Sequence, residues 1–239
     1  MRASDIAPSG KLRVGLNYQN FLLVAGDGPD GEPRGVAPDL ARELARRLEV
    51  PIQYVRFDTA GKLFDAVKAG QCDVGFLGNE PQRASEVAFT GPYLEIPVTF
   101  LVPEGSPIRA IADVDRNGLR IVVSERSAYD LYLSRYLKQA EIVRAPGIAA
   151  SFDWFVERKL EVLAGLKPKL MEENARLPGS RILEGQITGV QQSIAAPSGR
   201  DAAARYLREF VDDVKRSNPL RFPEARWPRR PGLHRSCAG

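Results

Sequence analysis

The chain has 239 residues, of which 44% are hydrophobic and 27% are charged, and its formal net charge is +4. This composition is typical of a folded globular protein, and the length allows one large domain or two modest ones. No apolar run approaches the roughly 18 residues that a membrane-spanning helix needs. No secretion leader is visible, so we expect either a cytoplasmic protein or a chain whose leader is not included.

The positive charge is concentrated at the carboxyl end. Arg221 to Gly239 holds five arginines and one glutamate, so this segment accounts for the whole excess of +4. The neutral remainder lacks the basic face that nucleic-acid binding needs, and we predict no nucleic-acid partner. Residues 219–239 combine several prolines with these arginines and show no apolar periodicity. We therefore predict an irregular basic tail over 219–239.

The first half of the chain alternates between patterns typical of strands and of helices. A Gly/Pro/Asp-rich loop is predicted over 26–35. The predicted strands and helices, in order, are a strand over 12–16, a helix over 37–48, a strand over 52–57, a helix around 63–67 that Gly70 can close, and a strand over 74–77. This order predicts a parallel sheet with helices on its faces.

The same alternation returns more weakly in the second half. It comprises a strand over 119–123, a helix with the stripe Tyr129, Tyr132, Leu133, Tyr136 and Leu137, a strand over 141–144, a helix over 152–159 and a strand over 160–164. Two extended segments, 96–102 and 187–196, connect the halves, and a helix over 202–215 follows. Two α/β units in one chain predict two lobes.

Several kinds of chemistry are excluded by what the sequence lacks. The only histidine, His234, lies in the predicted tail, where it cannot be positioned as a catalytic base or a zinc ligand. Cys72 and Cys237 are far apart and are predicted to be free thiols. The stretch 26–31 fits G-x-G-x-x-G, but its two aspartates would repel a pyrophosphate, so we interpret it as a turn-rich loop. We predict no cofactor and no metal.

Three stretches resemble a known family. They are GVAPDLARELARRLEV, FDAVKAGQCDVGFLGNEPQRASEVAFTGPY and FLVPEGSPIRAIADV, and LRIVVSERSAYDLYL is similar to the start of that family's second lobe. The chain resembles, from about Lys11 to about Ser217, the bacterial extracellular solute-binding proteins of family 3, the polar amino-acid-binding components of ABC importers. The resemblance implies a type II periplasmic-binding-protein fold, in which two α/β lobes are joined by two crossing strands and close on a solute by hinge motion.

This resemblance assigns residues to the two lobes. Residues 1–103 and 190–218 are predicted to form the first lobe, and 104–189 the second. The carboxyl ends of strands in open α/β sheets bind ligands, and Gly78 follows such a strand directly. By resemblance, Arg83 pairs with a carboxylate of the solute, an interaction that suits the planar guanidinium. The alternative is a structural ion pair of Arg83 with Glu80 or Glu86.

Further candidate binding residues surround the same cleft. They comprise polar or aromatic residues after the first strand, on the Arg83 loop, at the start of the second lobe's first helix and on the returning crossing strand: Tyr18, Asn20, Asn79, Glu80, Ser127, Tyr129 and Gln191. Free N–H groups at a helix start attract a carboxylate, and Ser127 adds a hydroxyl. Gln191 and Gln192 are neighbours on one strand, so only one of them should point into the cleft.

One departure from the family concerns the solute. Gly165-Leu166 stands where the family has an aspartate that binds the solute's ammonium group, which places Leu166 in the candidate site. Either Glu80 replaces that aspartate, or the solute has no ammonium group. We favour an amino acid or a close derivative because the Arg83 motif is well preserved.

The sequence leaves three functions open. The first is a monomeric, non-enzymatic periplasmic binding protein that delivers a small carboxylate-bearing solute to the membrane subunits of an ABC importer. The second is a dehydratase or lyase on the same scaffold, as in some relatives of the family. The third is a cytoplasmic or sensory ligand-binding module, which the missing leader favours. We prefer the first.

Overall fold

The structure is a computed structural model in which residues 2–217 are described. Its first lobe begins with the short helix η1 (Ala3–Asp5). The strands of this lobe are β1 (Leu12–Asn17), β2 (Gly26–Asp27), β3 (Pro33–Arg34), β4 (Ile52–Phe57), β5 (Val74–Gly78) and β6 (Val87–Phe89). Its α-helices are α1 (Val36–Leu48), α2 (Ala60–Lys68), α3 (Pro81–Ala84) and α7 (Asp201–Ser217).

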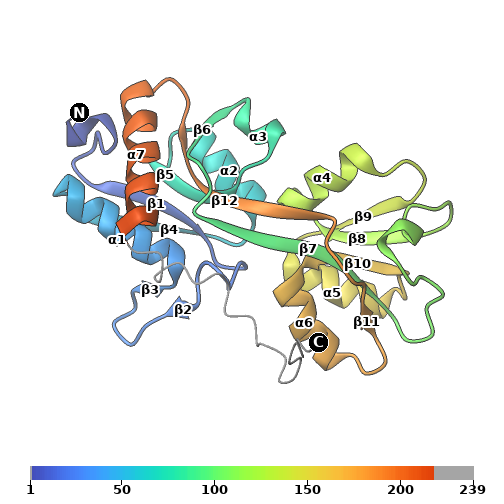
Figure 1. Ribbon diagram of the computed structural model, residues 1–239. Helices are drawn as coiled ribbons and strands as arrows, with labels where there is room; N and C mark the ends of the chain where they lie inside the picture. The colour runs from blue at the N-terminus through green and yellow to red at the C-terminus, as the bar shows by residue number, and fades with distance from the viewer. Residues whose placement is uncertain (1, 218–239) are drawn as a thin grey trace, which may run out of the picture.

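The second lobe lies at the opposite end of the molecule (Figure 1). Its strands are β8 (Arg120–Ser124), β9 (Glu141–Ala145), β10 (Val162–Leu166) and β11 (Arg181–Ile182). Its helices are η2 (Ile111–Asp113), α4 (Ala128–Tyr136), α5 (Ile148–Glu157) and α6 (Lys167–Arg176). The segment 219–239, predicted as a tail, and the thiol of Cys237 lie outside the described residues.

Two long antiparallel strands join the lobes, β7 (Leu94–Val102) and β12 (Thr188–Pro197) (Figure 1). They lie in the middle of one continuous sheet with the order β4-β1-β5-β12-β7-β10-β8-β9, beside which β6 pairs with β12 and β11 with β7. β7 therefore leaves the first lobe to pair with β10 in the second, and β12 returns to pair with β5. The predicted α/β fold, with two lobes and two crossing strands, is confirmed. The predicted lobe boundaries fall near the end of β7 and the start of β12.

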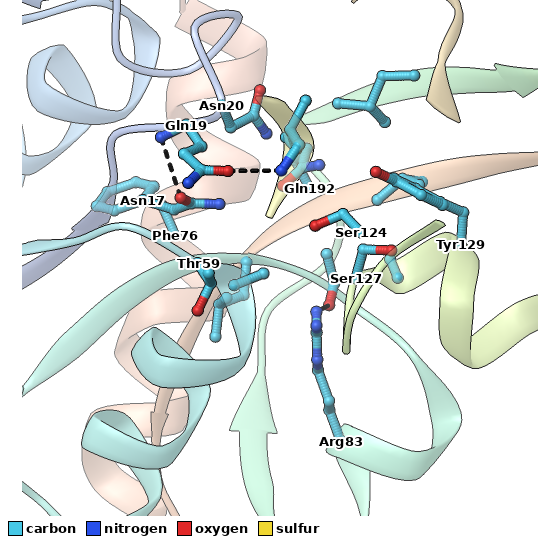
Figure 2. Close-up of a pocket in the computed structure, with 17 residues that line it drawn as sticks. Asn17, Gln19, Asn20, Thr59, Phe76, Arg83, Ser124, Ser127, Tyr129 and Gln192 are labelled. Carbon is cyan, nitrogen blue, oxygen red and sulfur yellow. Dashed lines mark hydrogen bonds between the residues drawn. The ribbon is translucent and has the colours of Figure 1, made fainter. Parts of the chain in front are cut away.

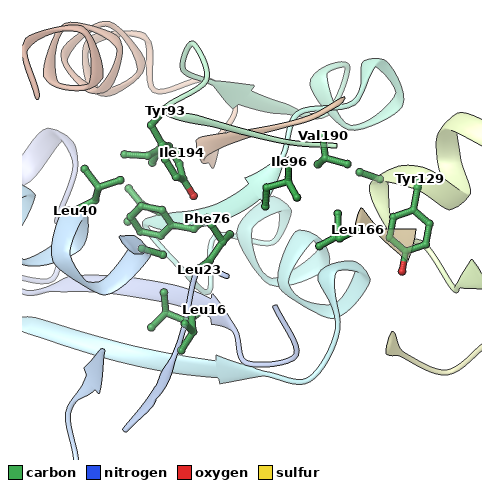
Figure 3. Packing of buried hydrophobic residues seen from close by; sticks show 14 of the residues in the cluster. Leu16, Leu23, Leu40, Phe76, Tyr93, Ile96, Tyr129, Leu166, Val190 and Ile194 are labelled. Atoms are coloured by element: carbon green, nitrogen blue, oxygen red, sulfur yellow. The ribbon is translucent and has the colours of Figure 1, made fainter. Parts of the chain in front are cut away.

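Helices cover both faces of the sheet. Neighbouring residues of a strand point to opposite faces, so apolar residues next to each other on a strand pack against helices on different faces. On β5, Phe76 packs in the cluster that contains the apolar faces of α1 and α7, whereas Leu77 packs in the cluster under α2. In the second lobe, Tyr129 of α4 lies on one face and Phe155 of α5 on the other. Figure 3 shows how the first of these clusters continues through the crossing strands, at Ile96 and Val190, into the second lobe.

The predicted strands and most predicted helices occur within a few residues of their predicted bounds. The loop over 26–35 contains the β2–β3 hairpin, in which the N–H of Gly28 donates to the carbonyl of Glu32. The glycines of this stretch therefore belong to a hairpin turn, as the interpretation of a turn-rich loop predicted. Helix α6 was not predicted. The placement of Tyr136 in a core stripe was wrong: its side chain is 59% exposed and stacks on Tyr132, with ring centroids 4.4 Å apart.

Candidate functional site

A pocket lies between the two lobes, beside the crossing strands (Figure 2). Its empty volume is about 510 Å³ when its opening to solvent is included. Asn17, Gly78, Ser124 and Leu166 line it, and each is the last residue of its strand, β1, β5, β8 and β10. The topology thus brings four strand ends from both lobes to one place, as expected for an open α/β sheet.

Six of the predicted residues line this pocket: Asn20, Gly78, Arg83, Ser127, Tyr129 and Leu166. Four further polar residues of the lining were not predicted from the sequence, namely Asn17, Gln19, Thr59 and Ser124. Asn17, Thr59 and Ser124 end or closely follow predicted strands, so the rule that ligands bind at the carboxyl ends of strands could have found them.

Arg83 is the central charged residue of the pocket. It lies in the short helix α3, and only 3% of its surface is exposed. Its Nη1 donates to the carbonyl oxygen of Gly78 at 2.9 Å, and its Nη2 donates to that of Arg126, in the second lobe, at 2.6 Å. Burial lowers the pKa of Arg83 to about 10, so the guanidinium stays charged at neutral pH. Within residues 2–217, no carboxylate forms a salt bridge with it.

The alternative role of Arg83, an ion pair with Glu80 or Glu86, is wrong for both partners. Oε2 of Glu80 lies 2.6 Å from Nη2 of Arg135 on α4, and Glu86 pairs with Lys68. Glu80 is buried by this contact and does not line the pocket. The pairing of Glu80 with an arginine of the second lobe also leaves it unavailable as a substitute for the family's aspartate.

Three other predicted residues lie away from the pocket lining. The hydroxyl of Tyr18 donates to Asp27 at 3.0 Å, and the guanidinium of Arg56 lies over its ring. The backbone N–H of Asn79 donates to the carbonyl oxygen of Gln191, so this contact holds the loop to β12. Gln191 is exposed, whereas its neighbour Gln192 is 3% exposed and lines the pocket. The alternation of side chains along β12 therefore selects Gln192.

The second lobe contributes a wall of hydroxyl and apolar groups. Ser127 is the N-cap of α4, where its Oγ accepts from the N–H of Asp130 at 3.1 Å. Its hydroxyl also lies within hydrogen-bond reach of the phenol of Tyr129. Burial raises the pKa of Tyr129 to about 12, so this phenol is neutral at pH 7. Leu166, at the end of β10, is 6% exposed and adds apolar surface.

The lobes contact each other around the pocket. The N–H of Ile148, at the start of α5, donates to Oε1 of Gln19 at 2.6 Å, and one of the dashed lines at Gln19 in Figure 2 marks this bond. On the other side, Arg126 forms two hydrogen bonds with Asp65, at 2.7 and 2.8 Å. Together with the contacts of Arg83 and Glu80, these bonds connect the first lobe to the second. The structure is therefore a closed arrangement of the lobes.

Two further observations concern the described residues outside the pocket as well as within it. Of residues 2–217, no helix is long and apolar enough to cross a membrane. The same residues contain no cluster of three or more His, Cys, Asp or Glu side chains suited to a metal ion.

Two lobes, two crossing strands and an interlobe pocket with a buried arginine define the class of two-lobe solute-binding proteins. The chain belongs to the bacterial extracellular solute-binding proteins, family 3, whose pattern matches residues 12–228. The match ends later than the resemblance to about Ser217 that we derived from the sequence. A comparison with curated protein sequences found no match.

Solved structures of similar fold include amino-acid-binding proteins. A putative binding component of an ABC transporter from Wolinella succinogenes DSM 1740, complexed with lysine, has a TM-score of 0.73 at 21% identity, covering 87% of this chain and 91% of that one. Holo ArgBP from T. maritima has a TM-score of 0.74 at 22% identity, with coverages of 89% and 93%. The ancestral amino-acid-binding protein AncCDT-1, a precursor of cyclohexadienyl dehydratase, has a TM-score of 0.73 at 20% identity, with coverages of 90% and 94%.

Proposed function

We propose that this protein captures a small carboxylate-bearing solute between its lobes and delivers it to the membrane subunits of an ABC importer. The observation that carries the proposal is Arg83, a charged guanidinium that is 97% buried at the pocket and has no carboxylate partner among residues 2–217. An isolated buried charge is costly, so such groups are normally paired. A bound carboxylate supplies the missing negative charge in a geometry that guanidinium favours.

The surroundings of Arg83 support a clamp. Its Nη2 already donates across the cleft to the second lobe, so a solute held by Arg83 lies where both lobes can contact it. Ser127 and the N–H groups at the start of α4 offer further donors from the second lobe. The two crossing strands provide the hinge. The solute therefore stabilises the closed arrangement, which is the form that importer subunits would recognise.

Binding without catalysis is favoured by the chemistry of the lining. Its residues include no Asp, Glu, His, Lys or Cys, so the groups that most often transfer protons are absent from the described pocket. The remaining phenol, Tyr129, is held neutral by burial. A dehydratase or lyase would need such a group near the solute. The delivery role and a periplasmic location rest on the family, whose members are extracellular solute-binding proteins. We expect a monomer.

The test begins with the native protein. Mass spectrometry of denatured protein, purified from its own host, identifies small acids that were retained in the pocket. Calorimetry with the identified compound should then give one site per chain, with no product formed on long incubation. Conversion of the compound would support the enzyme alternative, and detection of the protein only in the cytoplasm would contradict the delivery role.

A further inference from the structure

The charges around the pocket restrict the solute beyond its carboxylate. Among residues 2–217, Arg83 is the only ionised side chain that lines the pocket. The other polar groups are neutral amides and hydroxyls, and the rest of the lining is apolar or glycine. A free amino acid would place its ammonium group inside this lining. A buried ammonium without a carboxylate partner is as unfavourable as the unpaired guanidinium itself.

Three carboxylates on or beside the helices that flank the pocket are paired with arginines. Glu80 lies 2.6 Å from Arg135, and Asp65 lies 2.7 Å from Arg126. Asp130, which is 2% exposed, accepts from Nε of Arg144 at 3.0 Å and from the N–H of Arg126 at 2.8 Å. Breaking any of these contacts to reach a ligand would leave an arginine unpaired. None of the three carboxylates lines the pocket.

The sum of charges in the closed pocket separates two kinds of solute. Arg83 and one carboxylate sum to zero. Arg83 and a zwitterionic amino acid sum to +1, with the ammonium and the guanidinium repelling each other in a region of low dielectric constant. Leu166 makes the binding of an ammonium group still less favourable, because it presents a buried apolar side chain at the end of β10 instead of a hydrogen-bond acceptor.

One polar atom indicates what the solute carries in place of the ammonium group. Oδ1 of Asn20 is buried and has no hydrogen-bond partner, although Asn20 lines the pocket and is 93% buried. Figure 2 shows Asn20 and Arg83 at opposite ends of the group of lining residues. Buried acceptors are nearly always satisfied, so a donor is missing at this end. A hydroxyl or an amide N–H donates to such an oxygen without bringing a charge.

From these observations we infer that the solute is a carboxylic acid with no ammonium group, whose second polar group is an uncharged donor: a hydroxy acid or an N-acylated amino acid. The inference rests on the proposed function, because it assumes that Arg83 binds a carboxylate. It restricts the proposed solutes to derivatives in which the ammonium group of an amino acid is replaced or acylated. It also replaces the sequence-based hypothesis in which Glu80 binds an ammonium group. Phe76, Tyr129 and Leu166 supply the apolar surface for the body of such a molecule.

The experiment compares matched compounds on the full chain. Each series consists of a common amino acid, its 2-hydroxy acid, its N-acetyl derivative and the acid with hydrogen in place of the amino group. All series are screened by thermal shift. The affinities of every member of a series that stabilises the protein are then measured by calorimetry. We expect the hydroxy or N-acetyl compound to bind best and the parent amino acid to bind at least about tenfold more weakly than it. Equal or tighter binding of the amino acid would overturn the inference while leaving the proposed function intact. Binding of no member of any series would count against both.

Variants give an independent measurement of the same preference. Leu166→Asp adds a carboxylate at a helix N-cap, a position where aspartate is favourable, and should shift the preference by about tenfold or more toward the amino acid. Leu166→Asn, in which the new side chain has the shape of aspartate but no charge, should not shift the preference. Glu80→Gln should weaken both members of a pair by the same factor, because it changes the contact with Arg135 and the charge near Arg83, which act alike on the carboxylate that both compounds carry. A selective loss of the amino acid in Glu80→Gln would contradict the inference, since it would show that Glu80 binds an ammonium group.

Discussion

Nη2 of Arg83, in the first lobe, donates a 2.6 Å hydrogen bond to the carbonyl oxygen of Arg126, in the second. Arg126 has a φ of 54°, a conformation that is uncommon for a residue with a side chain, and its N–H donates to Asp130. Its guanidinium meanwhile pairs with Asp65 of the first lobe. One residue therefore contacts the first lobe through both its carbonyl and its side chain. Solute binding at Arg83 and closure of the lobes are physically linked at this point.

Replacement of Arg83 should remove most of the binding affinity. Truncating one partner of a buried, hydrogen-bonded charge pair costs roughly 3–5 kcal/mol, about a hundredfold to several-thousandfold in affinity. We expect this loss in Arg83→Ala and a smaller one in Arg83→Lys, which keeps the charge but not the planar fork. Calorimetry on variants with a native circular dichroism spectrum is the measurement. A loss below about threefold in the alanine variant would mean that Arg83 does not contact the solute.

The two interlobe ion pairs should contribute unequally to closure. The Glu80 side chain is 9% exposed and that of Arg135 36%, whereas those of Asp65 and Arg126 are 55% and 47% exposed. An exposed ion pair contributes a few tenths of a kcal/mol. A pair that is more buried contributes more, because water and salt screen its charges less. We expect Glu80→Gln to weaken binding by about 1 kcal/mol or more and Asp65→Asn by less than half of that. Calorimetry at low and high salt compares them; a larger effect of Asp65→Asn would contradict this ranking.

Much of the fold could be predicted because its signals are local. Helix α1 buries Leu40, Leu44 and Leu48 at helical spacing, and β5 is a short continuous apolar run. Helix α6 has few apolar residues, with Leu170 as its main contribution to the core, so its periodicity gives little signal. Pro168 suits the first turn of a helix, but it is also common in loops.

The site was less predictable because its contacts join distant parts of the chain. Glu80 and Arg135 are 55 positions apart, and no local pattern pairs them. The choice between Gln191 and Gln192 depends on the register of β12 against β5, where Gln192 faces Gly78. A shift of one residue would reverse the choice. Arg83, in contrast, lies in a short helix that closely follows a recognisable strand, so its place at the pocket could be predicted from the sequence.

Gly78 lies close to the second lobe, and a side chain there should hinder closure. A Cβ atom at Gly78 would lie 2.7 Å from Cγ1 of Val190 on β12 and 3.0 Å from Cβ of Ala128 in the second lobe. Both distances are shorter than normal contacts, so Gly78→Ala should favour an open arrangement and weaken binding. Gly91→Ala is the matched control, because a Cβ there meets no atom within 4 Å.

Small-angle scattering tests this directly. The radius of gyration of the wild type and of Gly91→Ala should fall on addition of saturating solute, as the lobes close over the hinge strands. That of Gly78→Ala should stay larger at the same solute concentration. An unchanged profile in the wild type would count against a clamp, and full closure of Gly78→Ala would show that Val190 and Ala128 yield to the added methyl group.

The affinity for the solute should be independent of pH over a wide range. A carboxylic acid is ionised above its pKa of about 4, and burial leaves the pKa of Arg83 at about 10. Burial disfavours the charged guanidinium, and only that charged form binds the anion. The affinity should therefore be constant from about pH 6 to about pH 9 and should fall as the pH rises through the pKa of Arg83 in the solute-free protein. Calorimetry in buffers of differing ionisation enthalpy measures both the affinity and any proton uptake.

Arg83→Lys moves this alkaline limit to lower pH. An ordinary lysine has a pKa of about 10.4, about two units below that of arginine, and the same burial lowers it further. The affinity of this variant should already decline between about pH 7 and pH 9, a range in which the wild type shows no change. A decline of the wild type in that range would show that another group titrates in the site. Parallel pH profiles for the two proteins would mean that the residue at position 83 carries no charge that the solute uses.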